Sequence, residues 1–248
     1  VFADNQLLDR LYIFVASEEE RVLYASALSG CEYKELIVGV PGGAAVSNFI
    51  VNYFPEGTPI VFADDDLYRF FTFSQDGKYN KVAYNLKDYI VNGFQTTANL
   101  KTNGFTFSFF SNKFYLKGKP FAEFRPFFLA GNFFGAFNSS DLLVPAESSH
   151  LDDSLRTINI LQKYQGVLVF WWGGFETYYG QEEGGLQASG ERKDTKAICE
   201  QYKEHSGLNT WMSIKEKKGL WSWQMKPKNR IPVSFVCKEF TWPEFVSP

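Results

Sequence analysis

The sequence contains few residues of the kinds that build disulfide frameworks or sulfur-ligated metal sites. Among its 248 residues there are three cysteines, none of them in a C-x-x-C spacing, and two histidines. An odd number of widely separated cysteines argues against a disulfide framework and against a thiolate zinc site. We therefore expect Cys31, Cys199 and Cys237 to be buried, reduced thiols.

Long apolar segments and the common nucleotide-binding motifs are also missing. No apolar run approaches the ~18 residues of a membrane-spanning helix, so we expect no contact with a membrane. There is no signal-peptide pattern, and because the chain does not begin with Met we expect its native N-terminus to be cut or processed. Neither G-x-G-x-x-G after the first apolar run nor G-x-x-x-x-G-K-[ST] occurs, so no motif indicates a dinucleotide or P-loop fold. A net charge of −3 excludes a globally basic nucleic-acid binder but permits a local basic strip.

Hydrophobic and aromatic residues are abundant. They include 26 Phe, and hydrophobic residues make up 45% of the chain, so a chain of this length can bury a large core. We find no internal repeat and no low-complexity linker. These observations predict a single domain over residues 1–248.

The beginning of the chain alternates between strand-like and helix-like segments. In the order strand, helix, strand, helix, strand, these segments cover residues 11–16, 18–29, 36–40, 45–53 and 59–63. Ser17 and Glu20 have the spacing of a capping box at the first helix. This order predicts an α/β fold with a mostly parallel central sheet flanked by helices.

The middle of the chain is rich in phenylalanine. A helix is expected over 82–100, and alternation with a period of two predicts an additional antiparallel, aromatic-rich section between 105 and 137. Such a density of Phe is typical of a core, although a few rings at the edge of a cleft can stack on a base or a sugar. The breaks at Gly131-Asn132 and at Gly135 indicate a bend or a close approach of the backbone.

Three consecutive carboxylates, Asp64, Asp65 and Asp66, follow the third predicted strand. Adjacent acids repel one another, and a hard divalent cation such as Mg²⁺ would compensate them while also taking phosphate oxygens. In open α/β sheets, ligands collect at the carboxyl ends of strands, which is where this triplet falls. The triplet alone is equally compatible with a solvated acidic turn in which Asp66 caps a following helix.

A second acidic pair, Asp152-Asp153, begins a predicted helix that continues to Tyr164. One explanation is that acids in a first helical turn complement the helix dipole. The other is that one of the pair is a general base, which must be ionised and within hydrogen-bond reach of a nucleophilic hydroxyl. His150 precedes the pair, and it is compatible with a metal ligand and with an ordinary turn histidine.

Two further segments have a functional and a plain structural interpretation. Pro41-Gly42-Gly43 precedes a predicted helix and either brings backbone close to a nucleotide or simply makes a turn. A locally basic strip near the C-terminus suits phosphates and unstacked bases, but it is also compatible with a solvated charged face. The residues of this strip are Lys215, Lys217, Lys218, Trp221, Trp223, Lys226, Lys228 and Arg230.

The order of these elements resembles that of the GT-A nucleotide-sugar glycosyltransferases. A closer resemblance is to the TET/JBP-associated glycosyltransferases, a largely phage family related to the base J glucosyltransferase of kinetoplastids. It spans about residues 10 to 230 and rests on Asn48-Phe49-Ile50, Phe54, Gly57, Ile60-Val61, Asp64-Asp65-Asp66, His150-Leu151-Asp152-Asp153, Gly184-Gly185-Leu186 and Arg192.

The resemblance implies transfer of a sugar from a UDP-sugar, UDP-glucose being the first candidate, to the hydroxymethyl group of 5-hydroxymethylcytosine or 5-hydroxymethyluracil in DNA. The resemblance further implies that the single domain has two halves and a C-terminal tail at 231–248. The half at about 10–103 would bind the nucleotide sugar, and the half at about 104–230 would bind the acceptor. Asp64 and Asp66 would contact Mn²⁺ or Mg²⁺ and the nucleotide, with Asp65 beside them. The cytoplasm of a phage-infected bacterium is the location that the family implies.

The remaining implied roles concern the reaction. Asp153, or Asp152 if the register differs by one, would take the proton from the acceptor, and a single displacement would invert the anomeric centre. Gly184 and Gly185 would lie with the donor, and Arg192 would stabilise the departing diphosphate. Two alternatives stay open: a GT-A transferase acting on a protein, lipid or glycan, and a non-catalytic aromatic-rich module that binds sugar or nucleic acid.

Overall fold

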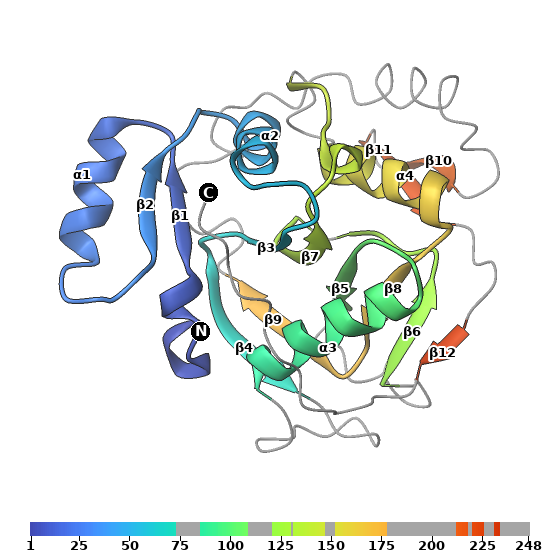
Figure 1. Cartoon of the computed structure of the whole chain (residues 1–248). Coiled ribbons are helices and arrows are strands. Elements are labelled where there is room, and N and C mark those ends of the chain that lie inside the picture. Colours follow the sequence, from blue (N-terminus) through green and yellow to red (C-terminus); the bar gives the residue numbers. More distant parts are fainter. Residues whose placement is uncertain are drawn as a thin grey trace.

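The computed structural model describes residues 1–72, 85–108, 121–129, 131–146 and 152–177, together with strands at 212–217, 220–225 and 231–233. This part of the chain is a mixed α/β structure in which helices cover both faces of a six-stranded sheet (Figure 1). Every helix within these ranges is too short or too polar to cross a membrane.

The six-stranded sheet is mostly antiparallel. In spatial order its strands are β12 (Ile231–Val233), β6 (Ala122–Arg125), β8 (Val167–Phe170), β5 (Phe105–Phe107), β7 (Phe133–Phe137) and β3 (Pro59–Ala63). The strands β5 and β8 are parallel, whereas each of the other neighbouring pairs is antiparallel. The α/β class is confirmed, but the prediction of a mostly parallel central sheet is wrong.

The position of β7 explains the difference. This strand runs back between β3 and β5 and pairs antiparallel with both. Gly135 of β7 lies opposite Phe105, and a Cβ on Gly135 would be 2.2 Å from the Phe105 ring. Because Gly135 has no side chain, the ring can lie across the strand, which confirms the close approach expected there. The order of elements along the sequence does not show this insertion.

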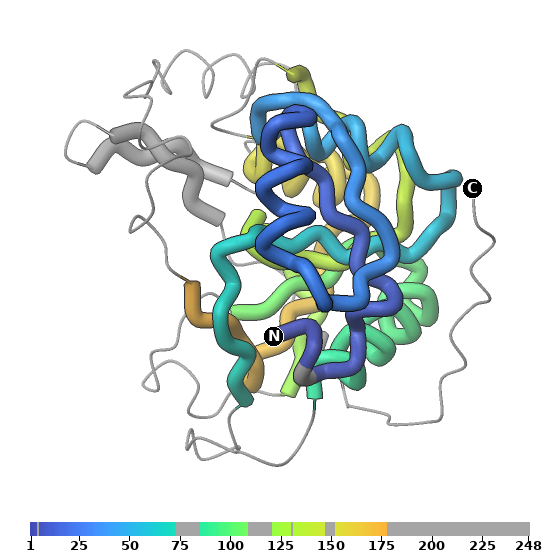
Figure 2. Tube along the Cα trace, turned by 90° about the vertical axis from the view of Figure 1, so that its left-hand side faces the viewer, coloured from blue at the N-terminus to red at the C-terminus, as the bar shows by residue number. Residues whose placement is uncertain are grey.

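The strands β1 (Tyr12–Val15) and β2 (Glu35–Val38) form a separate parallel pair, with helix α1 (Glu18–Ala27) between them in the sequence. This unit lies at one edge of the molecule, and Figure 2 shows it from its outer side. Ser17 caps the start of helix α1, and its hydroxyl accepts a hydrogen bond of 3.3 Å from the Glu20 N–H, as the sequence predicts. Cys31 is exposed, so the expectation of a buried thiol is wrong there, and the other two cysteines lie outside the described residues.

The acidic triplet lies between two strands and not before a helix. Strand β3 ends at Ala63, Asp65 and Asp66 form a turn, and β4 (Leu67–Thr72) follows directly. Strand β4 pairs antiparallel with β9 (Gly173–Thr177), and neither strand was predicted. The alternative in which Asp66 caps a helix is therefore wrong.

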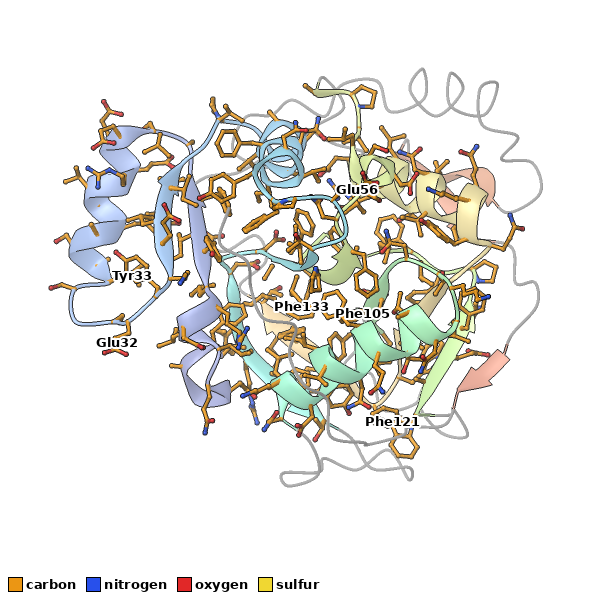
Figure 3. The ribbon with its side chains drawn as sticks, in the orientation of Figure 1. Glu32, Tyr33, Glu56, Phe105, Phe121 and Phe133 are labelled. Carbon is orange, nitrogen blue, oxygen red and sulfur yellow. The ribbon has the colours of Figure 1, made fainter. Side chains whose placement is uncertain are left out.

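The core has a layer on each face of the sheet. Helix α3 (Leu86–Asn99) covers one face, where it packs its buried Leu86, Tyr89, Ile90 and Phe94 against rings that include Phe105 and Phe133 (Figure 3). Asn85 caps this helix in a capping box with Asp88, so the helix starts later than predicted. Helices α2 (Gly43–Tyr53) and α4 (Asp152–Tyr164) contribute to the core on the other face, with Val51 and Ile160 among the residues packed there.

The remaining elements are short. Single-turn 3-10 helices lie at η1 (Ala3–Asn5), η2 (Leu8–Arg10) and η4 (Ser140–Leu142). Strands β10 (Met212–Lys217) and β11 (Leu220–Met225) form a separate antiparallel pair.

Candidate active site

The first acidic group, the triplet Asp64-Asp65-Asp66, lies at the edge of the sheet where β3 ends and β7 begins. The backbone N–H of Asp64 donates a hydrogen bond of 3.0 Å to the carbonyl oxygen of Asn132. Strands β3, β5 and β8 run in the same direction, since β3 and β5 are each antiparallel to β7 and β5 is parallel to β8. Their carboxyl ends therefore meet at this edge, and in parallel α/β sheets the edge at the carboxyl ends of the strands is the one that binds ligands.

The second acidic group reaches the same edge from helix α4. Asp152 and Asp153 form the first turn of α4, and the backbone N–H of Gly131 donates to the Asp153 carboxylate. A Cβ on Gly131 would lie 2.4 Å from both carboxylate oxygens of Asp153. Gly131 contacts Asp153 while its neighbour Asn132 contacts Asp64, so one dipeptide joins the two groups. We refer to Asp64, Asp65, Asp66, Asp152 and Asp153 together as the acidic site.

Loss of water raises the pKa of three of these carboxylates, and repulsion from neighbouring carboxylates adds to the rise for Asp64 and Asp153. Asp64 is exposed as a residue, but nearby protein atoms remove water from its carboxylate and raise its pKa from 3.8 to about 7, with Asp153, Asp66, Asp65 and Asp152 adding to the rise. Loss of water, and then repulsion from Asp152, also raises the pKa of Asp153 to about 7. Arg156 and the Gly131 N–H oppose this rise. The pKa of Asp152 is raised by burial, against the attraction of Arg156.

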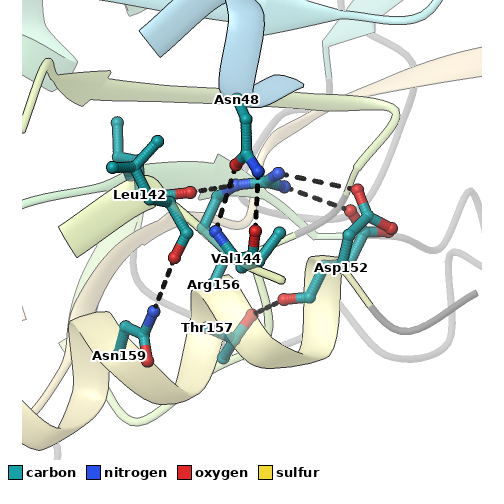
Figure 4. Close-up of polar contacts among 9 residues, drawn as sticks. Asn48, Leu142, Val144, Asp152, Arg156, Thr157 and Asn159 are labelled. Atoms are coloured by element: carbon teal, nitrogen blue, oxygen red, sulfur yellow. Dashed lines mark hydrogen bonds and ion pairs between the residues drawn. The ribbon is translucent and has the colours of Figure 1, made fainter. Parts of the chain in front are cut away.

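Arg156 is the buried cation beside the acidic pair (Figure 4). Its side chain is 2% exposed, and its Nη2 and Nη1 atoms lie 3.5 Å from Asp152 Oδ2 and 3.5 Å from Asp153 Oδ1, respectively. Its Nε donates a hydrogen bond of 3.3 Å to the carbonyl oxygen of Leu142. The spacings of three and four residues place all three side chains on one face of α4. Arg156 thus holds both carboxylates in position from the buried side of the site.

Two stacked rings support the guanidinium. Phe62 of β3 and Phe134 of β7 stack with their centroids 4.7 Å apart and their planes 7° apart. The Arg156 guanidinium carbon lies 5.9 Å from the Phe62 centroid and 5.2 Å from that of Phe134. Since Phe62 is two residues before Asp64, this packing couples the helix that holds one acidic group to the strand that holds the other.

Further polar contacts hold the start of α4 and the loop before it. The Thr157 hydroxyl donates to the Asp153 carbonyl oxygen at 2.7 Å and accepts from the Leu129 N–H at 3.0 Å. Asn48 on α2 donates to the Val144 carbonyl oxygen at 2.6 Å and accepts from the Val144 N–H at 3.1 Å (Figure 4). These contacts fix the backbone on both sides of the acidic pair.

The other residues of the triplet have different surroundings. Asp65 is exposed, and its Oδ2 accepts a hydrogen bond of 2.8 Å from the Tyr24 hydroxyl of α1. Asp66 is half-buried. The contact from Tyr24 links the β1-α1-β2 unit to the acidic site, so that Asp65 has a structural role alongside any role toward a ligand.

Gly42 and Gly43 lie at the start of α2, two residues earlier than the predicted helix begins. Gly42 has φ 96° and Gly43 is the first helical residue. A positive φ favours glycine at position 42 whether or not a ligand binds. The nucleotide-binding role of this turn stays a prediction.

Several predicted site residues fall outside the described residues or are described in their backbone alone. Lys215 and Lys217 lie on β10 and Trp221 and Trp223 on β11, with Lys215 paired to Ser222 and Glu216 to Trp221. Outside the described residues are His150, Gly184, Gly185, Arg192, Lys218, Lys226, Lys228 and Arg230.

The carboxylates suit a hard divalent cation. Within the described ranges, no three or more His, Cys, Asp or Glu side chains are grouped so that they could hold a metal ion. Mg²⁺, however, is commonly bound by one or two carboxylates together with substrate phosphates and water. Asp64 and Asp153 offer carboxylate oxygens of that kind, with a pKa that is raised by loss of water and then by repulsion from neighbouring carboxylates. Carboxylate oxygens are thus suitable ligands for Mn²⁺ or Mg²⁺ at this site. Metal binding by Asp64 and Asp66 stays a prediction.

Sequence reasoning missed Arg156. It predicted a bend or a close approach of the backbone at Gly131-Asn132, and the close approach is confirmed at Gly131, but it did not predict that these two residues contact the acidic site. The signal for Arg156 was present, because an acid followed three or four residues later by Arg on a helix predicts an ion pair. For Asn132 no local signal exists, since its contact with Asp64 depends on how β7 pairs with β3.

Comparisons with known proteins do not identify the chain. No protein-family profile, no curated protein sequence and no solved structure matches it. The function therefore has to be argued from the site.

Proposed function

We propose that the chain is a metal-dependent glycosyltransferase that uses a nucleotide sugar. The observation that carries the proposal is the meeting of two acidic groups, Asp64 to Asp66 and Asp152-Asp153, at the carboxyl edge of the sheet. Repulsion from Asp153 contributes to the raised pKa of Asp64, so the two groups act on one another although they come from distant parts of the chain. Such a site has one acidic group for a cation and a diphosphate and another for proton transfer.

The residues divide the chemistry between them. Asp64 and Asp66 would hold Mn²⁺ or Mg²⁺, which when bound neutralises charge on the diphosphate. Asp153 accepts the proton of the acceptor hydroxyl, whose oxygen then bonds to the anomeric carbon as the bond to the diphosphate oxygen breaks and its electron pair leaves with the diphosphate. A carboxylate with a pKa of about 7 is well matched to proton transfer near neutral pH. Arg156 keeps Asp153 in place during this step.

The acceptor that we propose is the hydroxymethyl group of a modified pyrimidine in DNA. This part rests on the resemblance of the acidic motifs to the TET/JBP-associated glycosyltransferases and on the composition of the basic strip at 215–230. A protein, lipid or glycan acceptor would use the same acidic site. The acceptor therefore needs a test of its own.

A thermal shift experiment tests the donor site. UDP and Mn²⁺ together should raise the melting temperature more than either alone, because a ligand at 100 times its Kd adds about 2.7 kcal/mol of stability. Asp64→Ala and Asp66→Ala should each remove this synergy and abolish sugar transfer. Asp9→Ala is the control, because Asp9 is exposed and distant in the sequence from the acidic triplet, and it should retain both the synergy and sugar transfer. Indifference of the parent protein to UDP with Mn²⁺ would favour the non-catalytic binding module.

Mass spectrometry tests the acceptor. Duplexes containing 5-hydroxymethylcytosine or 5-hydroxymethyluracil are incubated with the protein, Mn²⁺ and a panel of UDP-sugars, and digested nucleosides are examined for the mass of one added sugar. We expect a product with one of the two bases and none with unmodified cytosine or thymine. The anomeric configuration of that product, read by NMR, should be opposite to that of the donor. Absence of product from every duplex, with UDP binding intact, would exclude DNA as the acceptor.

A further inference from the structure

A small hollow lies beside the acidic site, on the side of β5 and β9. It is lined by Phe107, Ser108, Asn132, Phe133 and Phe175 and encloses about 20 Å³. Ala63 at the end of β3 pairs with Phe133, and the next residue, Asp64, is hydrogen-bonded to Asn132. The hollow is therefore directly adjacent to the strand end that carries Asp64. We call it the Asn132 hollow.

The size of the Asn132 hollow restricts what it can hold. About 10–15 Å³ of such volume accommodates one water molecule, so about 20 Å³ has room for a group of the size of one water or one hydroxyl. A whole base or sugar ring does not fit. An occupant larger than water must therefore insert one substituent and leave the rest outside.

The polar lining has free hydrogen-bonding capacity. Among the described residues, the Asn132 side-chain amide has no hydrogen-bond partner, and the hydrogen bond that this residue makes is accepted by its backbone oxygen. The Ser108 hydroxyl donates only a long bond of 3.4 Å to the Trp171 carbonyl oxygen, and its oxygen can still accept. An amide and a hydroxyl together can donate to and accept from one inserted hydroxyl group.

The apolar lining is aromatic. Phe133 and Phe175 stack with centroids 4.4 Å apart, and Phe107 meets Phe175 edge to face at 5.4 Å. Phe107 and Phe133 are buried, whereas Phe175 is half-buried and so offers part of its ring to the outside. Because these rings pack on one another, most of the accessible surface within the hollow is polar. The hollow therefore suits a hydroxyl group, and the exposed part of Phe175 suits the apolar face of the ring that carries this hydroxyl.

We infer that the Asn132 hollow receives one hydroxyl group of the sugar ring of the nucleotide-sugar donor, with the exposed part of Phe175 covering the ring. The inference rests on the proposed function, since it requires the diphosphate to lie at Asp64. The hollow then selects among sugars by the position of that hydroxyl. A ring without it leaves the Asn132 amide unsatisfied.

Isothermal titration with Mn²⁺ present tests the inference. UDP, UDP-glucose, UDP-galactose and UDP-xylose are titrated into the parent protein, Asn132→Ala, Ser108→Ala and the control Asn52→Ala, which changes an exposed asparagine on α2. Asn132→Ala leaves the backbone oxygen that binds Asp64 in place. We expect it to weaken the tightest UDP-sugar about 3- to 10-fold, as the loss of one neutral hydrogen bond does, and to leave UDP binding unchanged, with Asn52→Ala like the parent.

Deoxy analogues of the tightest UDP-sugar identify the hydroxyl. One monodeoxy analogue should bind the parent more weakly by the same factor and should lose nothing further in Asn132→Ala, because the two changes remove one contact. Three results would each overturn the inference. The parent and Asn132→Ala could bind UDP-sugars equally well, or every analogue could show losses that add to that of Asn132→Ala. The third is a crystal structure with UDP-glucose in which only water fills the hollow. If UDP itself does not bind the parent protein, the proposed function is wrong, and the inference, which depends on it, is wrong as well.

Discussion

At the residue scale, Arg156 determines whether two carboxylates can share the first turn of α4. It is the described cation that contacts both of them; Arg156 itself is buried, and the two carboxylates are half-buried. An uncompensated buried charge is strongly destabilising, whereas an exposed ion pair contributes little. Asp152 and Asp153 are therefore tolerated side by side because Arg156 is present.

Replacing Arg156 should show this dependence. Arg156→Met should lower the free energy of unfolding by about 3–5 kcal/mol, since it leaves the carboxylates without their cation. Arg156→Lys should lose less, because it keeps the charge but not the planar group that lies over Phe62 and Phe134. Urea unfolding measures both.

Lys163→Met provides the matched control for this prediction. Lys163 lies on the same helix and makes an ion pair of 2.7 Å with Asp141, but its side chain is 56% exposed. Its loss should change the free energy of unfolding by less than about 1 kcal/mol. A similar loss for Arg156→Met and Lys163→Met would contradict the role assigned to Arg156.

At the scale of elements, the turn before β7 assembles the site. Gly131 touches Asp153 of α4, and Asn132 binds the backbone after β3. The helices and several of the strands follow local signals, such as the capping-box spacing of Ser17 and Glu20 at α1, and the sequence predicted these elements. The order of strands depends on pairing between distant segments, which local patterns do not contain, and for that reason β4, β9 and the insertion of β7 were not predicted.

Gly131→Ala tests this turn. The added Cβ would lie 2.4 Å from the carboxylate oxygens of Asp153, so Asp153 or the turn has to move, at a cost of about 1–3 kcal/mol. Thermal unfolding should show the loss, and the synergy of UDP with Mn²⁺ should fall.

Gly39→Ala is a suitable comparison for Gly131→Ala. A Cβ on Gly39 would meet its nearest atom, on Phe49, at 3.5 Å, which is an ordinary contact. This variant should keep the stability and ligand response of the parent. Identical behaviour of the two alanine variants would mean that the close approach at Gly131 is unimportant.

At the scale of the whole molecule, the acidic site should dominate how stability depends on pH. Asp64 and Asp153 have a pKa of about 7 in the folded protein, against 3.8 as their ordinary value. Between about pH 4 and about pH 7 the folded protein thus binds more protons at these residues than the unfolded chain does. Their contribution is therefore greatest at about pH 4 and decreases as the pH rises to about 7.

Urea unfolding at a series of pH values measures this effect. Stability should decline from about pH 4.5 to about pH 7.5, and Asp64→Asn should make the decline shallower, whereas the exposed Asp9→Asn should follow the parent. Mn²⁺ should stabilise the protein more at pH 8 than at pH 5, because protons compete with the cation for the carboxylates. A parent protein whose stability rises across this window, with Asp64→Asn identical to it, would contradict the pKa assignments.

The pairing of β3 with β7 also has a consequence for the order of folding. Residues 59–63 and 133–137 are far apart in the sequence, and residues 105–107 pair with both 133–137 and 167–170. Contacts between segments so distant close large loops and slow the search for the native topology. A growing chain that has reached Asp64 but not yet residues 131–153 has no second acidic group near the first. Mutual repulsion of the carboxylates is thus absent early in folding and opposes the late docking of β7 and α4, so a divalent cation should accelerate that late step.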